Sequence, residues 1–226
     1  MEERHVGTNG ARVFLQPIAA PSILGLFAFA TATLAVGANL AGWYGGMNRT
    51  GLVFVAPLVA VAGLAQLLAG MWCYRARDGL GTAVHTLWGS FWIAFGLLLV
   101  FSSAGTIPAI PATGTFVPLG YWFLPVSIVT LIGSVAALRV NVATSAFLLL
   151  LAAAAAIEVP GFFLGRDWLI QIGGYAFLLS ALAATYTATG LLTHSLFGRE
   201  IPPLGSLAKR PSLAIGVGEP GVMVGQ

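Results

Sequence analysis

Three long apolar runs constrain this chain more than any other feature of its sequence. They are residues Ser22 to Met47, Gly51 to Tyr74 and Gly79 to Leu138, and none of them contains Asp, Glu, Lys or Arg. Each run reaches or exceeds the roughly 20 residues with which a helix crosses a hydrocarbon core. The chain is therefore predicted to be a membrane protein with several spans.

The composition excludes an ordinary soluble domain. Only 8% of the residues are charged and 58% are hydrophobic, whereas a soluble domain has about 25% charged residues. Six spans of about 20 residues occupy roughly 120 positions. The remainder of the 226 residues is needed for turns and tails, so no room is left for a separate soluble catalytic domain.

Turn residues divide the apolar sequence into six predicted helices. We expect an all-α integral membrane protein, with a compact transmembrane domain over residues 22–205. Residues 1–21 are predicted to form a cytoplasmic N-terminal tail, and residues 206–226 a disordered cytoplasmic tail. The six predicted spans are Ser22 to Tyr44, Leu52 to Cys73, Ala83 to Ser103, Phe116 to Leu138, Val142 to Phe162 and Trp168 to Leu192.

The basic residues predict the orientation in the membrane. If the N-terminus is cytoplasmic, two of the ten basic residues, Arg49 and Arg166, lie outside. This bias predicts that both termini are inside, because cytoplasmic loops carry an excess of Lys and Arg. It also argues against nucleic-acid binding, since the charge is spread over short loops and tails instead of one face. The basic residues on the inside are Arg4, Arg12, Arg75, Arg77, Arg139, Arg199, Lys209 and Arg210.

The sequence offers little for cofactor or enzyme chemistry. Cys73 is the single cysteine, so the chain cannot form an internal disulfide or a cysteine-based metal cage. The histidines His5, His85 and His194 are far apart and have no metal-ligand spacing. We expect no metal and no cofactor, and a membrane enzyme is the least favoured function.

Two ionisable side chains fall within the predicted spans. His85 lies near the inner end of the third span and Glu158 near the outer end of the fifth. Intramembrane ionisable groups are functional candidates. The alternative is that each side chain reaches the nearby interface, which is the interpretation we favour for Glu158. For His85, a pH-sensitive role and a structural role are equally consistent with the sequence, because its reference pKa is about 6.5.

Helix depth places three bulky apolar residues at one level. Phe29, Trp88 and Leu148 lie seven, five and six residues beyond the predicted inner helix ends, or roughly 8 to 10 Å deep at 1.5 Å per residue. Gln66 and Tyr186 lie at a similar depth on helices that run inward. Such a ring can gate a pore by excluding water, although ordinary packing of the bundle would give the same pattern.

Three short motifs resemble one family of transporters. The first is Ala20-Pro21-Ser22-Ile23-Leu24-Gly25-Leu26, and the third is Phe197-Gly198-Arg199 with Pro203-Leu204-Gly205. The second runs from Gly63 to Trp72 and continues at Trp88-Gly89-Ser90-Phe91-Trp92. Together they resemble N-P-A-P-L-G-L, G-x-A-Q-x-x-A-G with Y-G-S-F-W, and the C-terminal motif of the acetate and succinate uptake transporters, the YaaH-like proteins.

The resemblance implies a fold, an assembly and a set of site residues. It implies a homohexamer of six-helix protomers in the cell membrane, each with its own pore for small monocarboxylates. Phe29, Trp88 and Leu148 would then form the constriction. The motif at the mouth of the first helix would supply Pro21, Leu24, Gly25 and Leu26 to the pore entrance.

The chain also departs from the family pattern. Trp88 stands where tyrosine is usual, and His85 where an aromatic residue is common. Cys73 and Leu191 replace two glutamates that the family pattern leads one to expect. These differences bear on proton coupling and on the identity of the solute more than on the fold.

The leading hypothesis is a passive or proton-linked pathway for acetate and related small carboxylates, with succinate among the candidates. The spans hold no deep Arg or Lys, so hydrogen-bond donors would have to replace the water around the solute. One alternative is a channel for a neutral solute such as ammonia or urea, and another is a non-transporting membrane scaffold. The predicted polar side chains along the path are Gln66, Thr86, Ser90, Tyr186 and His85.

Overall fold

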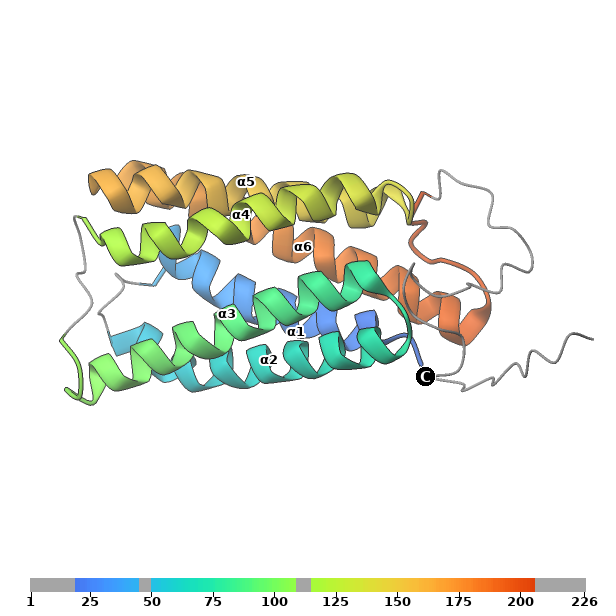
Figure 1. Cartoon of the computed structure of the whole chain (residues 1–226), viewed down its shortest axis with the longest axis horizontal. Helices are drawn as coiled ribbons and strands as arrows, with labels where there is room; N and C mark the ends of the chain where they lie inside the picture. The colour runs from blue at the N-terminus through green and yellow to red at the C-terminus, as the bar shows by residue number, and fades with distance from the viewer. Residues whose placement is uncertain (1–18, 45–49, 109–114, 206–226) are drawn as a thin grey trace, which may run out of the picture.

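The computed structural model describes residues 19–44, 50–108 and 115–205. Within these ranges the chain forms six α-helices that run along one axis (Figure 1). All six are long and apolar enough to cross a membrane, so the predicted all-α fold with six spans is confirmed. The helices are α1 (Pro21–Leu40), α2 (Thr50–Arg75), α3 (Gly79–Ser103), α4 (Val117–Ala137), α5 (Val142–Leu164) and α6 (Asp167–Phe197).

The helices pack as two groups of three around an aromatic centre. α2 packs along α3 and α4 along α5, while α1 joins the two groups through its contact with α6 (Figure 1). The backbones of α3 and α4 come close at few points. Large side chains fill the space between them, because the rings of Phe91 and Phe123 lie 5.2 Å apart between centroids.

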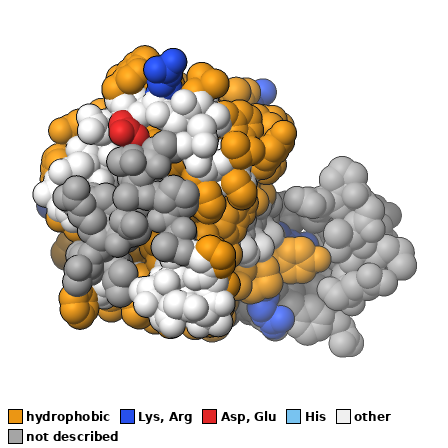
Figure 2. All heavy atoms as spheres, turned by 90° about the vertical axis from the view of Figure 1, so that its left-hand side faces the viewer, with side chains coloured by type: hydrophobic (Ala, Val, Ile, Leu, Met, Phe, Trp, Pro, Cys, Tyr) orange, Lys and Arg blue, Asp and Glu red, His pale blue; other side chains and the backbone are white. Residues whose placement is uncertain are grey.

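The flanks of the bundle are apolar. Phe54 on α2, Ile132 on α4 and Leu182 on α6 are all more than half exposed. Hydrophobic side chains cover much of the flank in the end-on view of Figure 2. A continuous apolar surface of this kind is stable against lipid or against another membrane subunit. The chain is therefore a multi-pass membrane protein.

Three helix ends differ from the predicted ones by four residues or more. α1 ends at Leu40 and not at Tyr44, because Gly42 adopts a left-handed conformation and turns the chain. α3 begins at Gly79, where the Asp78 carboxylate accepts a hydrogen bond from the Gly81 amide at 2.8 Å and caps the helix. α6 continues to Phe197, beyond the predicted end.

Tyr44 packs back onto α1 after that turn. Its hydroxyl donates a hydrogen bond to the carbonyl of Ala35. Burial raises the pKa of Tyr44 to about 12, because a buried phenolate would lose its hydration. The side chain therefore remains a protonated donor at neutral pH.

The segment Ile201 to Gly205, here called the C-terminal segment, closes the end of the bundle that is predicted to face the cytoplasm, here called the inner end. The carbonyls of Gly205 and Leu204 accept hydrogen bonds from the amides of Val142 and Ala143 at 2.9 and 3.0 Å. These amides belong to the first turn of α5, where backbone N–H groups have no acceptor within the helix. The Leu204 side chain is buried against Gly190 of α6. The segment therefore holds α5 and α6 together.

The two described chain ends lie at the same end of the bundle (Figure 1), as six spans require. Which side of the membrane they face stays a prediction. Most of the predicted N-terminal tail, residues 1–18, and the whole predicted C-terminal tail, residues 206–226, lie outside the described residues.

Single cysteines can test the predicted orientation. In a Cys73→Ser background, Arg166→Cys between α5 and α6 should react with an impermeant maleimide in intact cells. Arg139→Cys, between α4 and α5, should react only after the cells are permeabilised. Both positions are exposed, so accessibility is matched. The opposite labelling pattern would place the termini outside.

Candidate functional site

The predicted constriction residues lie in one buried cluster. Phe29 of α1 and Trp88 of α3 face each other edge to face, with ring centroids 6.2 Å apart. Leu148 of α5 belongs to the same cluster and is 1% exposed. Three helices thus bring these side chains into one core. Whether they form the narrowest part of a pore stays a prediction.

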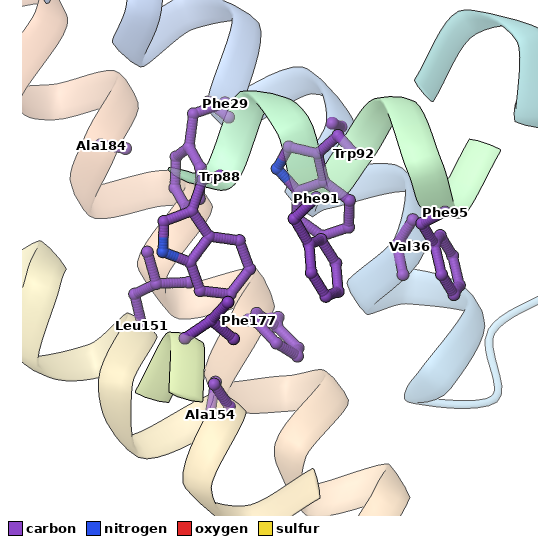
Figure 3. Packing of buried hydrophobic residues seen from close by; sticks show 14 of the residues in the cluster. Phe29, Val36, Trp88, Phe91, Trp92, Phe95, Leu151, Ala154, Phe177 and Ala184 are labelled. Atoms are coloured by element: carbon purple, nitrogen blue, oxygen red, sulfur yellow. The ribbon is translucent and has the colours of Figure 1, made fainter. Parts of the chain in front are cut away.

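Trp88 lies at the centre of this cluster (Figure 3). It is fully buried and its ring also contacts Phe177 of α6, with centroids 6.2 Å apart. Its indole Nε1–H donates a hydrogen bond to Oγ1 of Thr130 on α4 at 2.9 Å. The indole is therefore fixed on both its polar and its apolar sides, as a stable constriction would require.

Buried polar atoms without partners accompany the aromatic cluster. Both polar atoms of the Gln66 amide, Oγ1 of Thr86 and Nδ1 of His85 are buried and have no hydrogen-bond partner among the described residues. Buried polar groups are nearly always satisfied, so each exception needs an explanation. Three such side chains on α2 and the inner half of α3 could bind a polar solute.

His85 packs on the motif at the mouth of α1. A Cβ at Gly25 would lie 2.6 Å from Nδ1 of His85, so only glycine leaves room for the imidazole. The side chain is 3% exposed, which shows that it does not extend to the membrane surface. Gly25 and Leu26 are buried, whereas Leu24 is 52% exposed and Pro21 begins the helix. A role of His85 in pH dependence stays a prediction.

Ser90 and Tyr186 do not join the buried polar group. Ser90 is exposed, and Tyr186 is 43% exposed, with its hydroxyl donating to the carbonyl of Pro203 at 2.7 Å. Each lies two residues from a buried residue, Trp88 or Ala184, and two residues turn a helix by about 200°. Both side chains therefore point away from the core, contrary to the predicted path.

The favoured interpretation of Glu158 is wrong. Its side chain does not reach an interface but is fully buried. It lies against Gly173 of α6, which provides the space for the carboxyl group. The position of Glu158 along α5 does not reveal this burial, because the burial depends on packing against the neighbouring helix α6.

The two positions at which the resemblance leads one to expect glutamate, Cys73 and Leu191, have different surroundings. Cys73 is buried, with its Sγ 3.6 Å from Oγ of Ser22. The Ser22 hydroxyl also donates to the carboxylate of Asp78 at 3.4 Å. Leu191 is partly buried and packs against the aromatic core. Hence neither position carries a charge in this chain.

The predicted path left out two polar atoms beside the predicted constriction. Oγ1 of Thr33 and Nε1 of Trp92 are buried without a hydrogen-bond partner among the described residues. They lie one turn outward from Phe29 and Trp88, at the i, i+4 positions that share a helix face. That spacing could have identified them. The described residues contain no group of three or more His, Cys, Asp or Glu side chains that could hold a metal ion.

Comparisons with known proteins agree with this architecture. The model of the GPR1/FUN34/yaaH family matches residues 6–200. The chain is 28% identical over 188 residues to the succinate-acetate/proton symporter SatP of Escherichia coli (strain K12), which covers 83% of this chain and 96% of the symporter. It is 30% identical over 185 residues to acetate permease A of Emericella nidulans, which covers 74% of this chain and 59% of the permease.

A solved structure has the same fold. The structure of the bacterial acetate channel SatP superimposes with a TM-score of 0.74 at 24% sequence identity. The match covers 84% of this chain and 100% of that channel. The arrangement of six helices is therefore shared over nearly the whole transmembrane domain.

Proposed function

Because the chain belongs to the GPR1/FUN34/yaaH family, we propose that it is a membrane transporter for acetate and related small monocarboxylates. Its relatives are named as a succinate-acetate/proton symporter, an acetate permease and an acetate channel. These names support transport and not catalysis. We further propose that the protomers assemble as the homohexamer that the family resemblance implies.

One observation supports particular residues: the Gln66 amide is buried, has no hydrogen-bond partner among the described residues and lies at the level of the predicted constriction. Gln66 lies nine residues before the end of α2, and Trp88 nine residues after the start of α3. Both are thus roughly 13 Å from the inner helix ends. An amide at this level can donate a hydrogen bond to a carboxylate and accept one from a carboxylic acid.

The absence of buried cations shapes the mechanism. None of the buried side chains among the described residues is Lys or Arg, so no fixed positive charge compensates a desolvated anion. The neutral acid would pass the apolar ring more easily than the anion. Gln66, Thr86 and Thr33 would then replace part of the water around the polar end of the solute.

Replacing Gln66 with leucine tests this assignment. Losing one hydrogen bond to the solute, worth about 1.4 kcal/mol, should lower acetate flux about tenfold. Purified protein in liposomes, assayed with radiolabelled acetate against protein-free liposomes, gives the measurement. Ser90→Ala is the matched control, because Ser90 is exposed and its loss should leave flux unchanged.

The same liposomes separate acetate transport from its alternatives. Wild-type protein should raise acetate flux without raising urea or ammonia flux. Protein that conducts urea or ammonia but not acetate would contradict the proposal in favour of a neutral-solute channel. Folded protein that raises none of these fluxes would favour a scaffold role.

A further inference from the structure

Glu158 carries a buried carboxyl group. It is fully buried against Gly173 of α6, and neither carboxyl oxygen has a hydrogen-bond partner among the described residues. An ionised carboxylate in such a place is strongly disfavoured unless a cation or several donors stabilise it. The group is compatible with the membrane interior while it holds a proton.

The surrounding backbone is shaped for this side chain. A Cβ at Gly173 of α6 would lie 2.8 Å from Cδ of Glu158 and closer still to Oε1. Any other residue at 173 would therefore displace the carboxyl group. The close fit indicates a defined site, and not a polar side chain that has been trapped by chance.

Glu158 borders the outer end of the aromatic core. Glu158 lies seven residues beyond Leu151 on α5. Seven residues bring a side chain back to the same helix face within about 20° and move it roughly 10 Å along the axis, here toward the outer end. Leu151 lies near Trp88 (Figure 3). One turn beyond Glu158, Phe162 stacks on Phe123 with ring centroids 5.9 Å apart. The carboxyl group thus lies between the predicted constriction and the outer end of the bundle.

The helices packed against α5 supply no charge to this site. α1 has no ionisable side chain, and Glu158 is the only one on α5. All titratable or charged side chains on α4 and α6 are exposed. Those side chains are Tyr121 on α4 and Asp167, Tyr175, Tyr186 and His194 on α6.

We propose that Glu158 is a proton-binding site that exchanges a proton with the carboxylate solute on the outer side of the constriction. The proposal rests on the proposed function and deepens it. The O–H bond of the Glu158 carboxyl group breaks as an O–H bond forms on an arriving acetate. The resulting acetic acid crosses the apolar ring, and the Glu158 carboxylate takes up one proton from hydronium at the outer end, which leaves water. One proton thus moves with each acetate.

The pH dependence of acetate flux tests the proposal, with Glu158→Gln as the variant. Glutamine keeps the shape of the side chain but cannot donate a proton to acetate. At about pH 5, where much of the acetate is already protonated, variant flux should stay within about twofold of wild type. At about pH 7.5, where acetate is ionised, variant flux should fall at least about tenfold. Asp167→Asn, which neutralises an exposed carboxylate, is the matched control.

The possible outcomes are distinct. Wild-type protein without acetate flux at either pH would contradict the proposed function itself. Equal flux of variant and wild type at both pH values would overturn the role of Glu158. Equal loss of variant flux at both values, in folded protein, would also overturn it, because a purely structural or solute-binding role predicts that result.

Infrared spectroscopy gives a readout that does not depend on flux. A protonated carboxyl group has a C=O band distinct from that of a carboxylate. This band should be present in wild-type protein at neutral pH and absent from Glu158→Gln, while Asp167→Asn leaves it unchanged. A spectrum that Glu158→Gln does not alter would show that Glu158 holds no proton.

Discussion

Replacing Trp88 with alanine should raise acetate flux about tenfold, which corresponds to a barrier lowered by about 1.4 kcal/mol. The indole is the largest side chain of the predicted constriction and is fully buried. Its removal opens space between Phe29 and Leu148 and deletes the hydrogen bond to Thr130. Selectivity should fall at the same time, because an apolar constriction excludes solutes by size and by dehydration.

Two controls separate a wider pore from a damaged protein. Trp88→Tyr, which keeps an aromatic side chain at this position, should keep flux close to wild type. Trp88→Ala should also lower stability by about 3 to 5 kcal/mol, so thermal unfolding in detergent must show that the assayed protein is folded. Reduced flux through folded Trp88→Ala protein would mean that the indole binds the solute and does not restrict its passage.

Replacing Gly89 with valine should prevent the bundle from forming. A Cβ at residue 89 would lie 2.5 Å from the backbone nitrogen of Leu67 and 2.9 Å from the carbonyl oxygen of Gly63. Both atoms belong to the backbone of α2, so they cannot move aside as a side chain would. Overpacking of a flexible core costs about 1 to 3 kcal/mol, and a rigid backbone contact should cost more.

Gly133→Ala is the matched control for this substitution. A Cβ at Gly133 would meet side-chain atoms of Val84 and Leu80 at 3.4 and 3.6 Å, which are close to ordinary contact distances. The change should leave stability unchanged or raise it by about 0.5 to 1 kcal/mol, because alanine favours a helix over glycine. Yield, size-exclusion profile and thermal unfolding measure both variants. A monodisperse, stable Gly89→Val protein would contradict the close α2–α3 contact.

The sequence predicted the number and order of the helices because both follow from hydropathy alone. Every residue of a span must be compatible with lipid or with a protein interior, so apolar runs and the turns between them are sufficient. The helix ends were harder to predict. α6 extends to Phe197 because a helix can continue beyond the hydrocarbon core until a residue such as Gly198 adopts the left-handed conformation that ends it.

Matched helix depth predicted one level for Phe29, Trp88 and Leu148, and the rings of Phe29 and Trp88 do meet, but depth carries no information about direction. Ser90 and Tyr186 share the level of the core and point away from it. Direction requires the helical phase, which for Ser90 could have been taken from Trp88 on the same helix. The burial of Glu158 could not be predicted in this way, since it depends on Gly173, a residue of another helix.

The C-terminal segment makes the order of synthesis matter for this bundle. The first two amides of α5, those of Val142 and Ala143, donate to the carbonyls of Gly205 and Leu204, which leave the ribosome after all of α6. The helix that carries Leu148 and Glu158 is therefore incomplete at its inner end until the last described residues have been translated. A chain that is truncated within residues 201–205 would insert six spans and still lack the final contact that fixes α5 in place.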